Sequence, residues 1–526
     1  MAPGTPAPHD GVVYRSRGMA LVIGESASAA DAARELLKRA PKLRIALFAP
    51  GAGGVKDLPP GITVVGGRIV SLQGHLGQFS ASVRVAVDKV EDAGIFSANE
   101  DRRFDLVLDL CRVPLLRQTV LPHGYYAPGD DPAALVRALD SLPQLLGDFY
   151  KPKYFDYRSQ LCVHGAMGVA GCTRCLDVCS TAAIRSTGEK IEVNPWLCQG
   201  CASCTLACPT GALGFEQPTQ KALERTLSEL LAKRPADAVA HVLVVHDAAT
   251  RHLLPAMDAS RVLLLEVNPL PAFSELLWLS ALAGGISGVV LAVAPATRNL
   301  IDLKVRELRA ILASLGGDPA ALQIVDPASV GAVIDRIKDG MRPIALTAAP
   351  INGGSPDAKR ASFLARVDAF AQSRQASGEA DKHEPCELPA GAPFGNVLVD
   401  SEKCTICLAC THLCPTGALS GQLEPSPALR FTESLCVQCD LCHAGCPEKA
   451  ITLEARFLPD AAARESVREI ARDELVSCSS CGVPFTGRRK LAASLSLMAE
   501  YAKDLPGGVD SLRMCPNCRQ RATMTP

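Results

Sequence analysis

Short apolar runs alternate with helical patterns in the first part of the chain. Ala20–Ile23, Arg44–Phe48 and Ile62–Val65 have the length and composition of strands, and the alanine-rich segment Ser28–Arg39 has that of a helix. Strands that alternate with helices are typical of a sheet covered by helices. The pattern therefore predicts an α/β domain over residues 1–150.

The same alternation returns over residues 221–350. Strands are predicted at Val242–Val245, Val262–Leu265, Val289–Val293, Gln323–Val325 and Ile344–Leu346. The stretch Leu276–Ala294 contains no charged residue and is about long enough to span a membrane. Because Gly284, Gly285 and Gly288 interrupt it, we interpret it as a helix followed by a buried strand and predict no integral membrane segment.

Three further helices are predicted outside these domains. Residues 351–393 contain an amphipathic pattern, with Phe363 and Phe370 on its apolar side, and then a polar linker. The charged segment Asp460–Leu475 has a helical pattern, and so does Lys490–Lys503 near the end of the chain.

Cysteine is the residue type whose number changes this picture. The chain has 22 cysteines, mostly in closely spaced groups, which favours metal binding in a reducing compartment over a disulfide scaffold. The formal net charge of -1 suggests no nucleic-acid partner and no polybasic membrane contact. Residues Met1–Arg17 lack the basic stretch, apolar core and twin arginines of export signals, so we expect a cytoplasmic location.

Eight cysteines between residues 397 and 453 form two runs with the spacing Cys-x2-Cys-x2-Cys-x3-Cys-Pro. This spacing places three thiolates around one 4Fe-4S cube, and the fourth cysteine ligates the neighbouring cube in two-cluster ferredoxins. Zinc, the alternative, uses separated pairs of ligands. The predicted ligands are Cys404, Cys407, Cys410 and Cys446 for cube 3, and Cys414, Cys436, Cys439 and Cys442 for cube 4.

An earlier block repeats this arrangement with one difference. The run that begins at Cys198 is complete, but its partner begins at Cys172 and lacks the first cysteine in the usual place. Cys162 lies ten positions earlier, across a loop with three glycines, and is the expected replacement; a buried cysteine with a packing role is the alternative. The predicted ligands are Cys162, Cys172, Cys175 and Cys208 for cube 1, and Cys179, Cys198, Cys201 and Cys204 for cube 2.

Each run is followed by a similar small-residue tail, as in Cys414–Leu419, which indicates four copies of one cluster-binding unit. The two blocks resemble the bacterial two-cluster ferredoxin fold, a pseudo-twofold pair of short helices over β-hairpins. The segment Gly67–Val83 resembles the one ahead of such modules in heterodisulfide reductase A-like electron carriers. The α/β domain after Ala236 is similar to hydrogenase iron–sulfur subunits, although no cysteine lies between Cys208 and Cys386.

Proteins of this build also resemble accessory 4Fe-4S proteins of formate dehydrogenase systems. The resemblance implies a protein redox partner, either formate dehydrogenase or a heterodisulfide reductase-like complex. The turn Gly24–Ala29 lacks the later glycines of the dinucleotide fingerprint, so neither flavin nor NAD is predicted. Cys111, at the end of an apolar strand, is predicted to pack in a core, and Cys386 is interpreted as an ordinary thiol in a linker.

The last four cysteines form two separated pairs instead of a run. Cys478 and Cys481 make one pair, and Cys515 and Cys518 make the other. Two such knuckles are typical of one structural zinc ion held by four thiolates. A rubredoxin-like iron or an additional cluster would use the same paired thiolates.

Together these patterns predict a multidomain α+β chain with two ferredoxin modules, two α/β domains without a cofactor fingerprint and a zinc-knuckle tail. The predicted segments are 1–150 (α/β), 151–220 (ferredoxin), 221–350 (α/β), 351–393 (helix and linker), 394–456 (ferredoxin) and 457–526 (helix and four-cysteine tail).

Four cubes with four cysteines each leave no iron open to a substrate, and the sequence shows no triad or paired carboxylates. We therefore predict a non-catalytic subunit that relays electrons through four 4Fe-4S clusters to or from a partner redox enzyme. An accessory or maturation protein for such an enzyme is the alternative, and a self-contained oxidoreductase has the least support.

Overall fold

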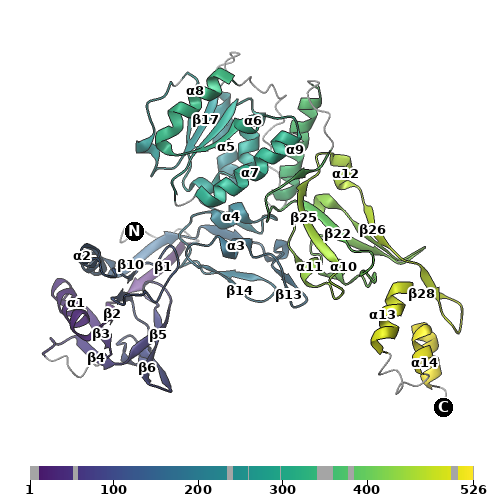
Figure 1. Cartoon of the computed structure of the whole chain (residues 1–526). Coiled ribbons are helices and arrows are strands. Elements are labelled where there is room, and N and C mark those ends of the chain that lie inside the picture. The colour runs from purple at the N-terminus through teal and green to yellow at the C-terminus, as the bar shows by residue number, and fades with distance from the viewer. Residues whose placement is uncertain are drawn as a thin grey trace. The chain divides into compact units, whose positions relative to one another are not determined.

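The computed structural model describes residues 11–50, 57–233, 241–258, 260–295, 298–340, 359–376, 384–498 and 508–524, and Figure 1 shows its helices and strands. The chain divides into two compact units. The first comprises residues 1–155, 179–185 and 192–200, and the second comprises residues 156–178, 186–191 and 201–526.

A five-stranded parallel sheet of order β4-β3-β2-β8-β9 forms the centre of the first unit. Its strands are β2 (Met19–Ile23), β3 (Arg44–Ala49), β4 (Ile62–Gly66), β8 (Leu106–Asp109) and β9 (Tyr125–Tyr126). Helices α1 (Ser26–Arg39) and α2 (Pro132–Ser141) cover one face, where Leu36 and Leu139 are buried. The predicted alternation of strands and helix in this region is confirmed.

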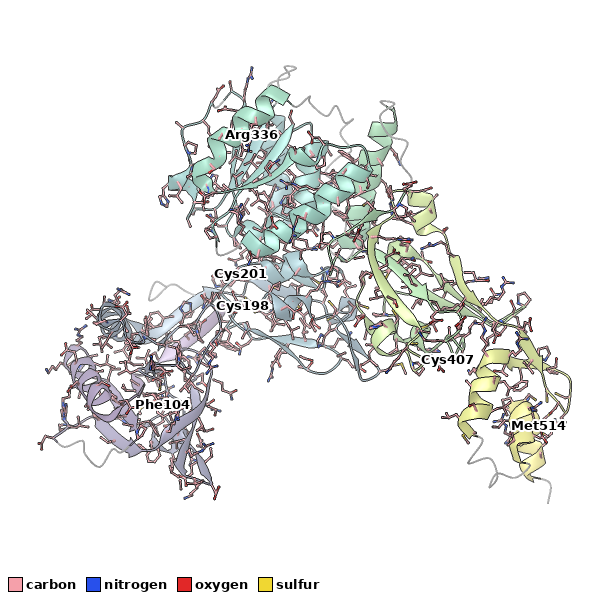
Figure 2. All side chains as sticks on the ribbon, in the orientation of Figure 1. Phe104, Cys198, Cys201, Arg336, Cys407 and Met514 are labelled. Carbon is pink, nitrogen blue, oxygen red and sulfur yellow. The ribbon has the colours of Figure 1, made fainter. Side chains whose placement is uncertain are left out.

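The opposite face of this sheet is covered by strands. An antiparallel sheet of β5 (Arg68–Gln73), β6 (Ser80–Ala86) and β7 (Lys89–Asp92) packs there through Ile69, Phe79 and Val83. Phe104, labelled in Figure 2, is fully buried in the same core. The segment Gly67–Val83 is therefore mostly a β-hairpin. Strand β1 (Gly11–Ser16) pairs antiparallel with β10 (Gly147–Pro152).

The second unit contains a four-stranded parallel sheet of order β18-β17-β19-β20. Its strands are β17 (Val242–His246), β18 (Val262–Glu266), β19 (Gly288–Ala292) and β20 (Leu322–Val325). Its helices are α5 (Gln220–Ala232), α6 (Glu275–Ala283), α7 (Arg298–Ser314) and α8 (Val330–Gly340). Four predicted strands are confirmed, and the fifth, Ile344–Leu346, lies outside the described residues.

The apolar stretch Leu276–Ala294 is most of helix α6 followed by strand β19, as predicted. Among the residues that the structure describes, no helix combines the length and apolar character needed to cross a membrane.

One hydrophobic core joins the four-stranded sheet β18-β17-β19-β20, the middle sheet, to the second cysteine block. Helix α9 (Lys359–Ala376) places Phe363, Val367 and Phe370 in the core that also holds α6 and α7. Phe394 and Phe457, which flank the second cysteine block, belong to the same core. The predicted apolar side of α9 is confirmed, and it fixes this block against the middle sheet.

Both cysteine blocks contain two short helices and small antiparallel sheets. In the first block these elements are β11 (Phe155–Tyr157), β12 (Gly165–Ala166), β13 (Val169–Ala170), α3 (Arg174–Asp177), β14 (Ile184–Ser186), β15 (Ile191–Val193), α4 (Ser203–Ala207) and β16 (Leu213–Phe215). In the second they are β21 (Cys386–Glu387), β22 (Gly395–Val399), α10 (Ala409–Leu413), β23 (Leu419–Gln422), β24 (Ala428–Phe431), α11 (Leu441–Ala444) and β25 (Ile451–Phe457).

The predicted charged helix Asp460–Leu475 is wrong beyond its first turns. Helix α12 (Ala461–Glu465) has only five residues, and β26 (Arg468–Arg472) then pairs antiparallel with β24. The cause is tertiary, because Arg468 forms an ion pair with Glu433, a side chain that is only 3% exposed. A buried carboxylate is stabilised by cationic partners, and Arg468 on the strand joins Arg456, which pairs with the same Glu433 side chain at 2.8 Å.

The tail after this strand is small. It consists of β27 (Leu475–Ser477), β28 (Pro484–Gly487), α13 (Arg488–Met498), a 3-10 turn (Gly508–Arg513) and α14 (Pro516–Met524). The predicted helix Lys490–Lys503 corresponds to α13, and its last residues lie outside the described part of the chain.

Candidate iron–sulfur and metal centres

The loops that carry the complete cysteine runs turn through left-handed backbone. Each places two residues with positive φ around its second cysteine, and these residues are Gly200, Ala202, Ile406, Leu408, Gln438 and Asp440. Left-handed backbone in residues other than glycine costs free energy and marks positions held by a local constraint. A loop wound tightly around a compact group is such a constraint.

The tails after the runs share a second left-handed position, three residues beyond the last cysteine. The residues there are Ala182, Gly211, Gly417 and Lys449, with φ of 52°, 75°, 69° and 49°. The backbone of all four tails therefore turns in the same way, which is what equivalent copies of a cluster-binding unit require.

The thiols predicted for cube 3 lie near one another. Cys410 is buried, and burial raises the pKa of its thiol to about 12, with further contributions from the charges of Cys407, Cys404 and Cys446. These are the three partners expected from the sequence. Figure 2 labels Cys407, on the loop ahead of α10.

The thiols predicted for cube 4 also lie together. Burial raises the pKa of the Cys442 thiol, and the charges of Cys436, Cys439 and Cys414 raise it further. Four thiols gathered in a buried place repel one another as thiolates unless a cation binds them. Iron supplies that charge in a cluster, so the donor set fits 4Fe-4S chemistry.

Cys162 reaches its predicted partners because the residues after it fold as a hairpin. Strands β12 and β13 pair, and the Gly171 N–H donates to the His164 carbonyl at 2.8 Å. The Cys172 N–H donates to the Val163 carbonyl at 3.4 Å, so the two ends of the ten-residue loop meet. The displaced cysteine therefore returns to the side of Cys172.

The four thiols of the predicted cube 1 are consequently close to one another. Burial raises the pKa of the Cys175 thiol to about 12, and the charges of Cys208, Cys172 and Cys162 contribute. Cys162 itself is 8% exposed. Its role as a ligand stays a prediction, since a buried cysteine has a packing explanation too.

For the predicted cube 2, Cys179 and Cys198 belong to the first unit, and Cys201 and Cys204 belong to the second. The assignment of these four cysteines to one cube therefore rests on their spacing and stays a prediction.

Several predicted ligands accept hydrogen bonds at sulfur. Backbone N–H groups of Ala183 and Ala450 donate to the Sγ atoms of Cys179 and Cys446 at 3.3 and 3.4 Å. Two side chains also donate to sulfur. Gln438 donates to the Sγ atom of Cys436 at 3.4 Å, and Arg174 donates to that of Cys172 at 3.6 Å. Such donors stabilise thiolate charge and tune the potential of a bound cluster. No local sequence pattern points to either side chain as a donor to sulfur.

The last four cysteines come together as predicted from their pairing. The Sγ atoms of Cys478, Cys481, Cys515 and Cys518 all lie within 4.8 Å of one another. A tetrahedral zinc site with bonds of about 2.3 Å places its sulfurs about 3.8 Å apart, so a small contraction completes it.

Backbone N–H groups favour the thiolate form of Cys478. The N–H groups of Cys515 and Ser480 donate to its Sγ at 3.2 and 3.4 Å. These bonds lower the pKa of the thiol to about 6. A thiolate held by backbone donors is a metal ligand that needs no further deprotonation near neutral pH.

The two remaining cysteines lie apart from these groups in sequence. Cys111 is partly buried against the core of the first unit, as predicted. Cys386 is not a linker thiol, because it pairs with Phe457 in strand β21 and packs against the large core of the second unit.

Comparison with known families identifies the class of both cysteine blocks. Residues 170–212 match the model of the 4Fe-4S dicluster domain, and residues 397–420 match that of the 4Fe-4S binding domain. The chain therefore carries two ferredoxin-type 4Fe-4S domains in a mixed α/β architecture. Domains of this class bind iron–sulfur clusters and support an electron-transfer role. No curated protein matches the chain.

Proposed function

We propose that this protein is an electron carrier that holds four 4Fe-4S cubes and relays electrons between a donor and a partner redox enzyme. One observation supports the proposal: among the cysteines that affect the thiol pKa values of Cys175, Cys410 and Cys442, the three largest contributions come from the partners predicted for the same cube, in cubes 1, 3 and 4. A bound 4Fe-4S cube supplies reversible one-electron chemistry.

The contribution of the chain is to hold and shield the clusters. Cys162, Cys410 and Cys436 are each 8% exposed, so protein covers these ligands. Backbone and side-chain donors to sulfur then favour the more negative, reduced form of a bound cluster. Four cysteines per cube leave each iron without an open position, which suits electron transfer and disfavours substrate chemistry.

The test is an anaerobic reductive titration of the reconstituted full chain. Four cubes that each accept one electron should take up about four electrons per chain, and an oxidised low-potential viologen should recover them. An uptake of about two electrons from protein with full iron content would contradict the four-cube relay. Stable co-purification with formate dehydrogenase or a heterodisulfide reductase-like complex would identify the partner.

A second function is favoured by the terminal cysteine group. We propose that Cys478, Cys481, Cys515 and Cys518 hold one zinc ion, which is redox-inert and stabilises the tail as a docking surface. An accessory or maturation protein for a redox enzyme would use such a surface for transient binding. Binding to the apo form of the partner enzyme, lost when the mature enzyme is supplied, distinguishes this role from that of a permanent subunit.

A further inference from the structure

The loops of the predicted cubes 1 and 4 lie in direct contact, although they come from different ferredoxin blocks. A Cβ added at Gly171, next to Cys172, would lie 2.6 Å from Leu441 Cγ and 2.7 Å from the Cys439 carbonyl oxygen. Only glycine lets the two backbones approach so closely. The charge of Cys172 also contributes to raising the pKa of Cys439, after burial and nearer cysteines.

A single side chain fastens this contact. Arg174, at the start of α3, donates from Nε to the Gly391 carbonyl at 3.2 Å and from Nη2 to the Gln438 carbonyl at 3.0 Å. Its Nη1 donates to the Val437 carbonyl at 3.2 Å and to Cys172 Sγ at 3.6 Å. With a further bond from Nη2 to the Ala392 carbonyl, its donors reach one cysteine loop, the other cysteine loop and the segment before β22.

Arginine is suited to this place by shape and by charge. Its planar fork presents five N–H donors in fixed directions, and five acceptors surround it here. The fork therefore sets the distance and the orientation of the two loops. Lysine has the charge but neither the fork nor the number of donors.

The positive charge of Arg174 lies next to Cys172 and therefore affects the reduction potential of a cluster bound by that cysteine. Reduction adds one negative charge to a cluster, so a cation that donates to one of its thiolates favours the reduced form. A cavity of about 430 Å³ is lined by Arg174 and Cys172 and by four further charged side chains, which are Asp177, Lys304, Glu307 and Asp440. Lys304 and Glu307 form an ion pair of 2.7 Å with each other, and to first order their charges cancel.

We propose that Arg174 joins cubes 1 and 4 into one junction, through which electrons pass between the two ferredoxin modules, and that its charge raises the reduction potential of cube 1. The inference rests on the proposed function. Each exchange moves one electron from the cube held by Cys439 to the cube held by Cys172, or back. One cube is oxidised as the other is reduced, and no bond forms or breaks.

The test compares Arg174→Met and Arg174→Lys with Arg306→Met, which removes an exposed arginine paired with Asp302 on α7. Full chains are reconstituted anaerobically, and iron content, redox titration and magnetic coupling between reduced cubes are measured by electron paramagnetic resonance. In Arg174→Met we expect full iron content and weaker magnetic coupling of one pair of cubes. The ratio of reduced to oxidised cube 1 at a given potential should fall about tenfold, which lowers its reduction potential by about 59 mV for one electron. Arg306→Met should resemble the unmodified protein.

Arg174→Lys separates the two parts of the proposal, because it retains the charge and loses the fork. Its potentials should stay near those of the unmodified protein while the coupling weakens. Gly171→Ala provides an independent variant if Arg174→Met holds less iron, since a Cβ there pushes the loops apart and leaves the arginine in place. It should weaken the same coupling.

Unchanged potentials and unchanged coupling in iron-replete Arg174→Met would overturn the inference and leave the four-cube carrier intact. Unmodified protein that binds too little iron for four cubes would instead overturn the proposed function. The two failures are distinguished by iron content alone.

Discussion

At the scale of single residues, Cys162 is the position where sequence and structure add most to each other. The spacing of the cysteines allowed two roles for Cys162, either a displaced cluster ligand or a packing residue. The hairpin β12–β13 reverses the chain, so that Cys172 lies beside Val163 and Cys162 lies near Cys175. The packing explanation does not require this return, whereas ligation does.

Replacing Cys162 by alanine therefore tests its role directly. Cys162→Ala should lower the iron content from about 16 to about 12 per chain if cube 1 is lost, or to about 15 if a three-iron cluster remains. Iron and sulfide analysis with electron paramagnetic resonance measures both outcomes. Cys111→Ala and Cys386→Ala are matched controls, because both cysteines are partly buried against hydrophobic cores and should leave the cubes intact. An unchanged cluster spectrum in Cys162→Ala would point to a different fourth ligand.

Residues such as Arg174 and Gln438 mark the limit of prediction at this scale. Candidate cysteine ligands could be named from the sequence because cluster chemistry fixes their local spacing. The acceptors of Arg174 outside its own cysteine block lie 217 to 264 positions along the chain. No local pattern specifies a contact of that separation, so an arginine between two cysteines looks like an ordinary solvated charge until the fold is known.

At the scale of elements, the strands and helices with strong periodicity were predictable and the context-dependent ones were not. The strands β2 and β19 are apolar over their whole length, and β3 and β17 each have one polar residue, at an end, because both faces of a parallel sheet are buried. Residues 468–472 carry alternating charge that suits a helix equally well. The ion pair of Arg468 with buried Glu433 favours the strand, and Glu433 is distant in sequence.

Helix α9 supports a prediction about stability. Phe370 is 1% exposed in the core that joins the middle sheet to the second ferredoxin module. Phe370→Ala should cost about 3–5 kcal/mol of folding free energy, because it removes a large buried side chain and leaves a cavity. Circular dichroism and cluster absorbance should show earlier unfolding of both regions together on heating.

The control lies on the same helix. Gln372 is exposed, so Gln372→Ala should leave both unfolding transitions within a degree or two of their original temperatures. If Phe370→Ala destabilised the middle sheet and left the cluster absorbance of the second module unaffected, a shared core would be contradicted.

The terminal element yields a prediction that separates zinc from the electron path. Cys515→Ser should remove about one zinc ion per chain and unfold the tail, because a structural zinc site contributes folding free energy directly. The uptake of electrons should remain about four per chain. Substitution keeps Arg489 in the chain, whereas truncation of the tail removes this side chain, which donates to the carbonyl oxygen of Ser401 near the first predicted ligand of cube 3.

Zinc analysis and reductive titration of Cys515→Ser, with Cys111→Ser as the control, test whether the terminal cysteines bind zinc. Full-length protein without zinc, or a Cys515→Ser variant that accepts one electron fewer, would place a redox-active iron at the terminal cysteines. The predicted zinc site would then be wrong, and the chain would have a fifth redox centre.

At the scale of the whole molecule, the second unit combines the middle sheet with the cubes that we propose as a junction. The middle sheet buries one face against α6, α7 and α9, and the core continues to Phe394 and Phe457 beside the second module. A densely packed core of this kind restrains the segments that carry the cysteine loops. Because electron transfer between clusters depends on a fixed short distance, such a support is what a relay requires of the rest of its chain.

The metal content of the intact protein follows from these parts and tests them together. Sixteen predicted cluster ligands at four per cube, and four terminal thiolates, should bind about 16 irons, about 16 sulfides and about one zinc per chain after anaerobic reconstitution. Colorimetric iron and sulfide assays with mass spectrometry for zinc measure all three on one sample. A stable value near eight irons would mean that one cysteine block does not hold two cubes, and the Cys162→Ala variant would then show which. If that variant retained all eight irons, the first block would be the one without its pair of cubes, and the junction at Arg174 would have only one cube to act upon.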